Sequence, residues 1–511
     1  MSKALLKSTG VVGGMTFISR ILGLIRDMVC AQFFGAGTGF DAFSVANRIP
    51  NFMRRLFAEG AFSLAFVPVF SEYREKRSHA ELQELVDYVA GTLGLILFAV
   101  TAVGVIAAPV LIWIFAHGFV DDPVKFNLTA EMLRITFPYL LFISLTAFAG
   151  GILNSCGRFA VPALTPVLLN ICMILGAVWV SPHLERPVVA LAWSVFIAGV
   201  VQLLFQLPYL HAAKLLPRPR WGWRSAGVQR ILKLMLPTLF GSSVAQINLL
   251  FDTLMASFLV TGSVSWLYYS DRLVEFPLGV FGVALGTVIL PNLSQKHAAA
   301  SLEAFSHTLD WALRWVLLIG LPATVALAIL AAPLLATLFQ YGEFEATDVI
   351  MASRSLTAYS LGLIAFMLVK VLAPGFYARQ DTRTPVKVGI IAMVSNMVLN
   401  VILIFPLAHA GLALATSLSS FINAGLLFHI LHRDSVYRPD DGWPRFLLQI
   451  TAANLLMGGA LWWASGDLVQ MWLEATLEAR LLRLSALVIG GLLVYALAII
   501  AVGIRPRHLK I

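Results

Sequence analysis

Charged residues are scarce in this chain. They make up 12% of its 511 residues, against 59% for hydrophobic ones, and the mean hydropathy is +0.84. A soluble domain typically carries about 25% charged residues, so too little polar surface is present here to cover a fold in water. The composition excludes an ordinary soluble protein and predicts one that lies largely within lipid.

Cysteine is rarer still. Cys30, Cys156 and Cys172 lie in or beside apolar segments, at spacings that suit neither a disulfide framework nor a zinc site. The sequence also lacks a compact set of catalytic carboxylates, metal ligands or a nucleophile–base pair, and it has no soluble domain to hold one. We therefore expect a protein that is not an enzyme and has no cofactor.

Basic residues exceed acidic ones, with a formal net charge of +9. They punctuate apolar segments and form no contiguous patch, so we expect no nucleic-acid partner. If the N-terminus is cytoplasmic, the opposite loops hold only Lys125, Arg186, Arg480 and Arg483 among the lysines and arginines of the connecting segments. The positive-inside rule then places both termini in the cytoplasm.

Long hydrophobic runs recur along the whole chain, each near the roughly 20 residues that cross a bilayer. Breaks rich in glycine and proline separate them. They predict an all-α polytopic membrane protein with about fourteen transmembrane helices. The expected helices cover residues 9–33, 41–71, 84–116, 128–154, 160–181, 187–212, 227–260, 264–295, 307–340, 348–377, 385–406, 410–432, 444–465 and 480–504.

Two halves of the chain resemble each other at a nearly constant offset. The segment RIPNF beginning at Arg48 resembles RLVEF beginning at Arg272, and Pro68 corresponds to Pro291. An even number of helices separates the equivalent segments, so the repeat is parallel, with its axis along the membrane normal. Such a repeat favours alternating access to a site between two lobes, although a duplicated channel or polytopic enzyme would show it too.

The repeat divides the expected helices into three parts. Residues 1–215 form an N-terminal six-helix lobe, residues 216–440 form a C-terminal six-helix lobe, and residues 441–511 add two further transmembrane helices.

Ionisable side chains are concentrated in the first, second and eighth expected helices. Each costs about 2.5–3.5 kcal/mol at the centre of a membrane helix, so we expect them to face a wet cavity. Several arginines in one cavity suit an anionic ligand, because guanidinium groups bind phosphate bidentately and stay charged. The candidates are Arg20, Arg26 and Asp27, then Asp41, Arg48, Arg54, Arg55 and Glu59, and finally Asp271, Arg272 and Glu275.

Structural roles remain open for several of these residues. Arg54 and Arg55 also fit as anchors that extend to the membrane interface. Asp27 could serve only to neutralise a neighbouring arginine, and Asp271 and Glu275 could serve only to pair with arginines.

Several longer motifs resemble signatures of the MurJ (MviN) lipid II flippase family. They are NFMRRLFAEGAFS from Asn51 to Ser63, LYYSDRLVEFP from Leu267, LFQYG from Leu338 and LAPGFYARQDTRTPV from Leu372. The similarity extends over essentially the whole chain, including the two last helices. This family belongs to the multidrug/oligosaccharidyl-lipid/polysaccharide exporter superfamily.

The resemblance implies that the chain flips lipid II, an undecaprenyl-diphosphate-linked disaccharide-pentapeptide, from the cytoplasmic to the periplasmic leaflet of a bacterial inner membrane. It implies that the two last helices form a groove for the polyprenyl tail. The family's important arginines correspond to Arg20, Arg26, Arg54 and Arg272, and its acidic positions correspond to Asp27, Asp41, Glu59 and Glu275.

Ion coupling is the least specified expectation. Asp252 and Asp381 could supply carboxylate oxygens to a sodium site, although isolated acids also form ion pairs. Some family members have an asparagine near the end of the tenth helix for such a site, and this chain has Tyr377 there. Coupling to the membrane potential or to a monovalent ion is therefore left open.

Three other functions remain as alternatives: a flippase for another polyprenyl-linked glycan, a cation-coupled drug antiporter of the same superfamily, and a membrane enzyme acting on the same lipid. The basic cavity disfavours the antiporter. We expect lipid II and membrane lipids as partners. Since one chain contains both lobes, we expect a monomer, with cell-wall synthesis proteins as candidate associates.

Overall fold

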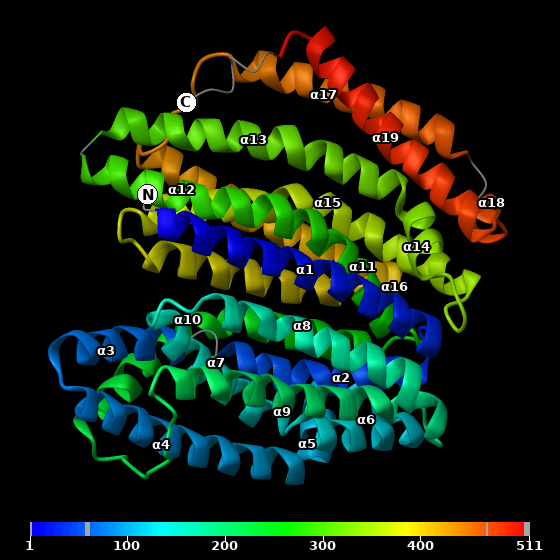
Figure 1. Cartoon of the computed structure of the whole chain (residues 1–511). Coiled ribbons are helices and arrows are strands. Elements are labelled where there is room, and N and C mark those ends of the chain that lie inside the picture. The colour runs from blue at the N-terminus through cyan, green and yellow to red at the C-terminus, as the bar shows by residue number, and fades with distance from the viewer. Residues whose placement is uncertain (1–2, 57–61, 300, 467–468, 505–511) are drawn as a thin grey trace. The chain divides into compact units, whose positions relative to one another are not determined.

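The computed structural model describes residues 3–56, 62–299, 301–466 and 469–504. Every regular element in these ranges is a helix, and none is a strand (Figure 1). The all-α class expected from the apolar runs is therefore confirmed.

The helices belong to two compact units, Met1–Val264 and Ser265–Ile511. The main helices of the first unit are α1 (Lys3–Phe34), α2 (Thr38–Arg54), α3 (Ser63–Lys76), α4 (His79–Ile106), α5 (Ala108–Phe115), α6 (Pro123–Thr136), α7 (Tyr139–Ser155), α8 (Ala160–Leu175), α9 (Val189–Ala212) and α10 (Ala226–Ser257). Those of the second are α11 (Ser263–Pro277), α12 (Val283–Ala298), α13 (Leu302–Ile329), α14 (Ala331–Phe339), α15 (Ala346–Tyr377), α16 (Arg383–Arg433), α17 (Trp443–Ser465), α18 (Val469–Leu473) and α19 (Leu477–Ala501).

The boundary between these units does not coincide with the lobe boundary expected from the repeat. Helix α10, which follows residue 215, packs on α2, α3, α4 and α5 and so falls in the first unit. The two last long helices, α17 and α19, pack on each other and on α13 and α14 of the second unit. The three-part division by the repeat stays a prediction.

The helices expected over residues 84–116, 128–154 and 307–340 are each divided into two, α4 and α5, α6 and α7, and α13 and α14. Two more of the expected long helices are interrupted, at corresponding positions of the repeat. The helix expected over residues 41–71 is α2, which ends at Arg54, followed by α3 from Ser63. The helix expected over 264–295 is α11, which ends at Pro277, then a π-helical turn over Leu278–Gly282 and α12. Proline removes a backbone donor from a helix, and single π-helical turns are frequent at functional sites.

Helix α16 is two helices joined across a kink. The backbone of Ala408 has φ 50° and ψ −129°, which no helix accommodates. The chain turns back so tightly here that a Cβ on Gly411 would lie 2.2 Å from the carbonyl oxygen of Leu403. The two separate helices expected over residues 385–406 and 410–432 are thus confirmed.

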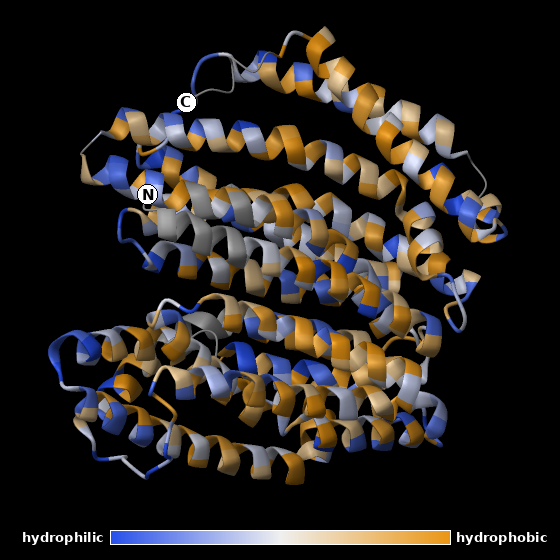
Figure 2. Ribbon diagram, viewed as in Figure 1, coloured by the Kyte–Doolittle hydropathy of each residue, from blue (hydrophilic) through white to orange (hydrophobic). Residues whose placement is uncertain are grey.

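Hydrophobic residues recur along most of the helices (Figure 2), and many large hydrophobic side chains are exposed on the protein. Nine helical stretches of the described chain are long and apolar enough to cross a membrane. In the apolar window of α16 only 22% of the residues are buried within the protein, which would be costly in water and is ordinary in lipid. A polytopic membrane protein is confirmed, and the count of fourteen spans stays a prediction.

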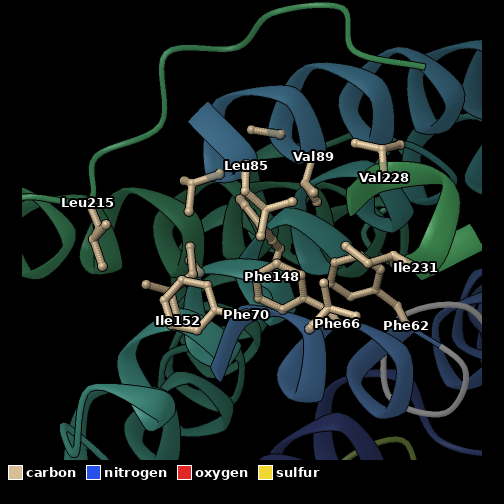
Figure 3. Close-up of a cluster of buried hydrophobic side chains, with 14 of the residues drawn as sticks. Phe62, Phe66, Phe70, Leu85, Val89, Phe148, Ile152, Leu215, Val228 and Ile231 are labelled. Atoms are coloured by element: carbon tan, nitrogen blue, oxygen red, sulfur yellow. The ribbon is translucent and has the colours of Figure 1, made fainter. Parts of the chain in front are cut away.

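A cluster of buried aromatic and aliphatic side chains joins α3, α4, α7 and α10 (Figure 3). The rings of Phe62 and Phe66 stack with centroids 5.2 Å apart, and Phe148 meets Phe66 edge-on at 5.1 Å. Such ring pairs contribute about 0.5–1.5 kcal/mol beyond the area that they bury. This cluster packs the N-terminal part of α10 against α3, α4 and α7.

Candidate functional site

Helix α1 carries a guanidinium group held by a carboxylate on the next residue. Arg26 donates from Nε and Nη2 to Oδ1 of Asp27, at 2.9 and 2.7 Å. A third bond runs from Nη1 to Oδ1 of Asn170 on α8, at 3.0 Å, and Asn170 donates in turn to the carbonyl of Ser19. The Arg26 and Asp27 side chains are 13% and 3% exposed, so the pair lies within the protein.

Arg20 is half-buried on the same helix. It precedes Asp27 by seven residues, close to two helical turns, so both project from one face of α1. The three predicted site residues of α1 therefore occupy neighbouring positions on this helix. The prediction that Asp27 neutralises an adjacent arginine is confirmed for Arg26.

The arginines of α2 have different surroundings. Arg48 donates to the hydroxyl of Thr253 on α10 at 2.7 Å, which ties the two helices together. Arg54 donates to Oδ1 of Asn51, one turn earlier, at 3.2 Å, and Arg55 is exposed. Arg55 directly follows α2 with helical backbone angles, φ −65° and ψ −36°, and the expectation that Arg48 and Arg55 share one helix face stays a prediction.

Asp41, near the start of α2, is almost completely buried. It accepts hydrogen bonds from Nζ of Lys125 and from the backbone N–H of Gly262, both at 2.8 Å. The ammonium group of Lys125 also lies 4.3 Å from the ring centre of Phe119. Asp41 therefore joins α2, α6 and the segment after α10, and its partner is a residue that the sequence placed in an outer loop.

Arg272, in the second unit, is the residue that corresponds to Arg48 in the repeat. Arg272 on α11 bonds Glu275 one turn later, with Nη1 and Oε2 2.6 Å apart. Its guanidinium also lies over the ring of Tyr268, 4.9 Å from the centroid. The predicted i, i+3 pairing of Arg272 with Glu275 is thus confirmed, and Asp271 lies half-buried beside them.

The two sodium-site candidates lie in different units. Asp252 of α10 accepts a long bond, 3.5 Å, from Nδ2 of Asn248. Oδ1 of Asp381 accepts the backbone N–H groups of Arg383 and Thr384, at 3.1 and 3.0 Å, and so caps the start of α16. A hydrogen bond from the Thr384 side chain, together with these backbone bonds from Thr384 and Arg383, holds the pKa of the Asp381 carboxyl below its ordinary value. Within the described ranges no group of three or more His, Cys, Asp or Glu side chains could hold a metal, and sodium binding stays a prediction.

Some members of these sites could not be expected from the sequence. Asn170 and Thr253 are neutral and lie in apolar helices, so no charge signalled them, and Tyr268 is one aromatic residue among many. Glu59 lies outside the described residues. The common feature of Arg26 and Arg272 is a carboxylate on the same helix and a second partner that orients the guanidinium group.

Comparison with known proteins gives a consistent result. A family model described as "Lipid II flippase MurJ" matches residues 30–482. A Vibrio cholerae protein named "Probable lipid II flippase MurJ" is 51% identical over 517 residues, covering 100% of this chain and 98% of that protein. A Burkholderia cenocepacia protein named "Lipid II flippase MurJ" is 44% identical, with 89% of each chain covered.

Solved structures agree in fold. One described as "Lipid II flippase MurJ, inward closed conformation" matches with a TM-score of 0.80 and 28% identity, covering 95% of this chain and 97% of that one. An inward-facing multidrug transporter of the MATE family and MOP superfamily matches with a TM-score of 0.67, covering 85% and 99%. At 17% identity the second likeness concerns the fold alone.

Proposed function

Since this chain belongs to the lipid II flippase MurJ family, and is a flippase and not an enzyme, we propose that arginines of α1, α2 and α11 bind the diphosphate of lipid II during its passage. The residues that we assign to this role are Arg20, Arg26, Arg54 and Arg272. The sequence predicts that these residues line a central cavity, and Arg48 and Arg55 are further candidates.

The observation that carries this proposal is the local pairing of Arg26 with Asp27 and of Arg272 with Glu275. A carboxylate on the same helix orients each guanidinium group and balances its charge when no ligand is bound. A diphosphate offers the same geometry of oxygen atoms with more charge, so it can take the place of the carboxylate at little cost in desolvation.

The acidic residues then have two roles in our proposal. Asp27, Asp271 and Glu275 balance the arginines when the cavity is empty, and Glu59 is assigned to the same group from the family resemblance. Asp41 acts differently, because its buried bonds to Lys125 and Gly262 hold α2 to α6 and to the segment that follows α10.

We further propose the bacterial inner membrane as the location, with both termini in the cytoplasm and transport towards the periplasmic leaflet. The distribution of lysine and arginine supports this orientation. The membrane potential would favour return of the positively lined carrier, by about 2.3 kcal/mol per charge per 100 mV. A sodium ion held by Asp252 and Asp381 is an alternative means of coupling.

The test is replacement of Arg272 in a host depleted of the native protein, with lipid II labelled separately on each membrane face. We expect Arg272→Ala to slow the appearance of lipid II outside by at least about tenfold, since a hydrogen bond between charged groups contributes about 1.5–3 kcal/mol. Arg272→Lys should retain part of the rate, because it keeps the charge and loses the bidentate geometry.

The matched control is Arg186→Ala, which removes an arginine that is 56% exposed and pairs with Glu131 on the surface. It should transport at the normal rate. Normal transport by a well-expressed Arg272→Ala variant would contradict the proposed binding role. If depletion leaves lipid II exposed outside while another surface glycan disappears, the assignment of lipid II as the substrate would be wrong.

A further inference from the structure

The connection between α9 and α10 lies directly against α4. We call residues 213–225 the strap. Its backbone N–H groups at Arg220 and Gly222 donate to the carbonyl of Asp87 and the hydroxyl of Thr92, at 3.0 and 3.2 Å. Asp87 and Thr92 are 5% and 2% exposed, so these bonds hold the strap firmly to the helix.

Two glycines allow this close approach. A Cβ on Gly91 of α4 would lie 2.2 Å from the carbonyl oxygen of Arg220, and one on Gly222 would lie 2.4 Å from the side chain of Tyr88. The backbone of the strap therefore lies directly against the backbone of α4, and the strap covers the neighbouring surface of this helix.

A cavity of about 430 Å³ lies beside the strap, between α4, α7 and α10. Its wall is almost wholly apolar, with Leu97 and Val100 from α4 and Ile231 from α10. Figure 3 shows part of this wall, where Val89 of α4 and Ile231 of α10 belong to the neighbouring aromatic cluster. Ligand pockets typically measure about 300–1,000 Å³, so the space suits a ligand and exceeds an ordinary packing defect.

The lining of the cavity includes one basic side chain, Lys233, and the indole of Trp223. A second hollow, lined by Trp221, Trp223 and Arg224 among others, shares Trp223 with it. The rings of Trp221 and Trp223 stack 6.1 Å apart and are 58% and 45% exposed. Exposed tryptophans and basic side chains together mark the level of lipid headgroups.

We propose that this cavity binds one acyl chain of an anionic glycerophospholipid, with the phosphate at Lys233 and Arg224. An apolar wall excludes a polar ligand, and basic sites between membrane helices bind anionic headgroups. None of the arginines assigned to lipid II lines the cavity, so this lipid site is separate from the transport site. A bound acyl chain fills the space between α4 and the N-terminal part of α10.

The experiment uses the full chain in nanodiscs with phosphatidylglycerol that carries a diazirine near the end of one acyl chain. After illumination, labelled peptides are identified by mass spectrometry. We expect label on residues 92–100 of α4 and 228–235 of α10. Wild-type chain that lacks label in both segments would overturn the proposal.

Two variants fill the cavity from opposite walls. Val100→Phe from α4 and Ser144→Leu from α7 should each remove the label, and the matched control Val103→Phe should retain it, because Val103 is 65% exposed on the same helix. Each variant is first checked for a single symmetric peak in gel filtration. Undiminished label in a filled variant that passes this check would overturn the site.

The headgroup is tested at Lys233. Lys233→Gln should lower labelling by phosphatidylglycerol about fivefold, as expected for one lysine near an anionic headgroup, and Lys233→Arg should restore it. Equal labelling by neutral phosphatidylcholine would overturn the choice of an anionic lipid. Loss of label on addition of undecaprenyl phosphate, but not of unlabelled phosphatidylglycerol, would assign the cavity to a polyprenyl chain and overturn the proposal.

Discussion

Lys125 and Asp41 form an ion pair that is almost completely removed from solvent, with side chains 5% and 1% exposed and a separation of 2.8 Å. Replacing Lys125 with methionine keeps an unbranched side chain one heavy atom shorter and removes its charge. Asp41 then stays buried with the N–H of Gly262 as a remaining donor. Breaking a buried pair from one side costs about 3–5 kcal/mol, and because Gly262 still serves one oxygen we expect about 3 kcal/mol.

The assay is equilibrium unfolding in mixed detergent micelles for the wild type, Lys125→Met, Asp41→Asn and the double variant. The double variant should be less destabilised than the sum of the single ones, because removing both charges leaves no uncompensated ion. We expect a coupling energy of at least about 1.5 kcal/mol between the two side chains.

The same helix supplies a control pair. Glu131 of α6 pairs with Arg186 at 2.6 Å, but the two side chains are 36% and 56% exposed. Exposed pairs contribute about 0–1 kcal/mol, so the Glu131→Gln and Arg186→Gln cycle should give a small coupling energy. A coupling energy for Asp41 and Lys125 no larger than that of the control would refute the argument from burial.

Arg480→Met should lower the thermal midpoint clearly, because Arg480 is 5% exposed and donates to the carbonyls of Ala336 and Leu473, each of which costs about 1–3 kcal/mol when left unpaired. The exposed Arg483 on the same helix is the control, and an equal loss in Arg483→Met would contradict this reasoning. Asp381→Asn tests a pH dependence. Since bonds led by Thr384 lower the Asp381 pKa, its stabilisation is complete above the ordinary value of 3.8 and is lost as the pH falls through the lower folded pKa. The stability difference between wild type and variant should therefore shrink from pH 7 to about pH 3, and a constant difference would exclude this role.

The sequence predicted where helices occur better than where they break. Hydropathy alone located the helical ranges, since apolar runs of this length have few other uses. It did not locate the end of α2 at Arg54, where the sequence RRLFAEG carries charges but no proline, or the π-helical turn at Leu278–Gly282, which lies inside a continuous apolar pattern. Pro277 was a local signal for the second break, and Pro50 and Pro68 remain within helices without ending them.

The candidate site was predictable only where partners are close in the chain. Helical spacing suffices for Arg272 with Glu275, and adjacency suffices for Arg26 with Asp27. The third partner, Asn170, comes from a helix far along the chain, and only the packing of α8 against α1 brings it there.

Lys125 and Arg480 show a different limit, because both were assigned to outer loops from hydropathy and both are buried. Charge in a connecting segment predicts orientation for the whole chain, and it does not predict exposure of a single side chain. In each case the buried charge meets acceptors at helix ends. Arg480 meets the carbonyls near the end of α14, and Lys125 meets the carboxylate in the first turn of α2.

The partners of a buried arginine indicate whether it can also bind a ligand. Arg480 bonds backbone carbonyls that end α14 and α18, and these would be left unpaired in the protein interior if it turned to a phosphate. Arg26 and Arg272 bond carboxylate side chains of their own helices, and a carboxylate released by an incoming anion can turn to water or a cation in the wet cavity that the sequence predicts. Since an unpaired buried carbonyl has no such alternative, the cost of exchanging partners is lower for Arg26 and Arg272. On this reasoning Arg480 anchors α19 to α14 and α18, and Arg26 and Arg272 are better suited than Arg480 to the diphosphate binding that we propose.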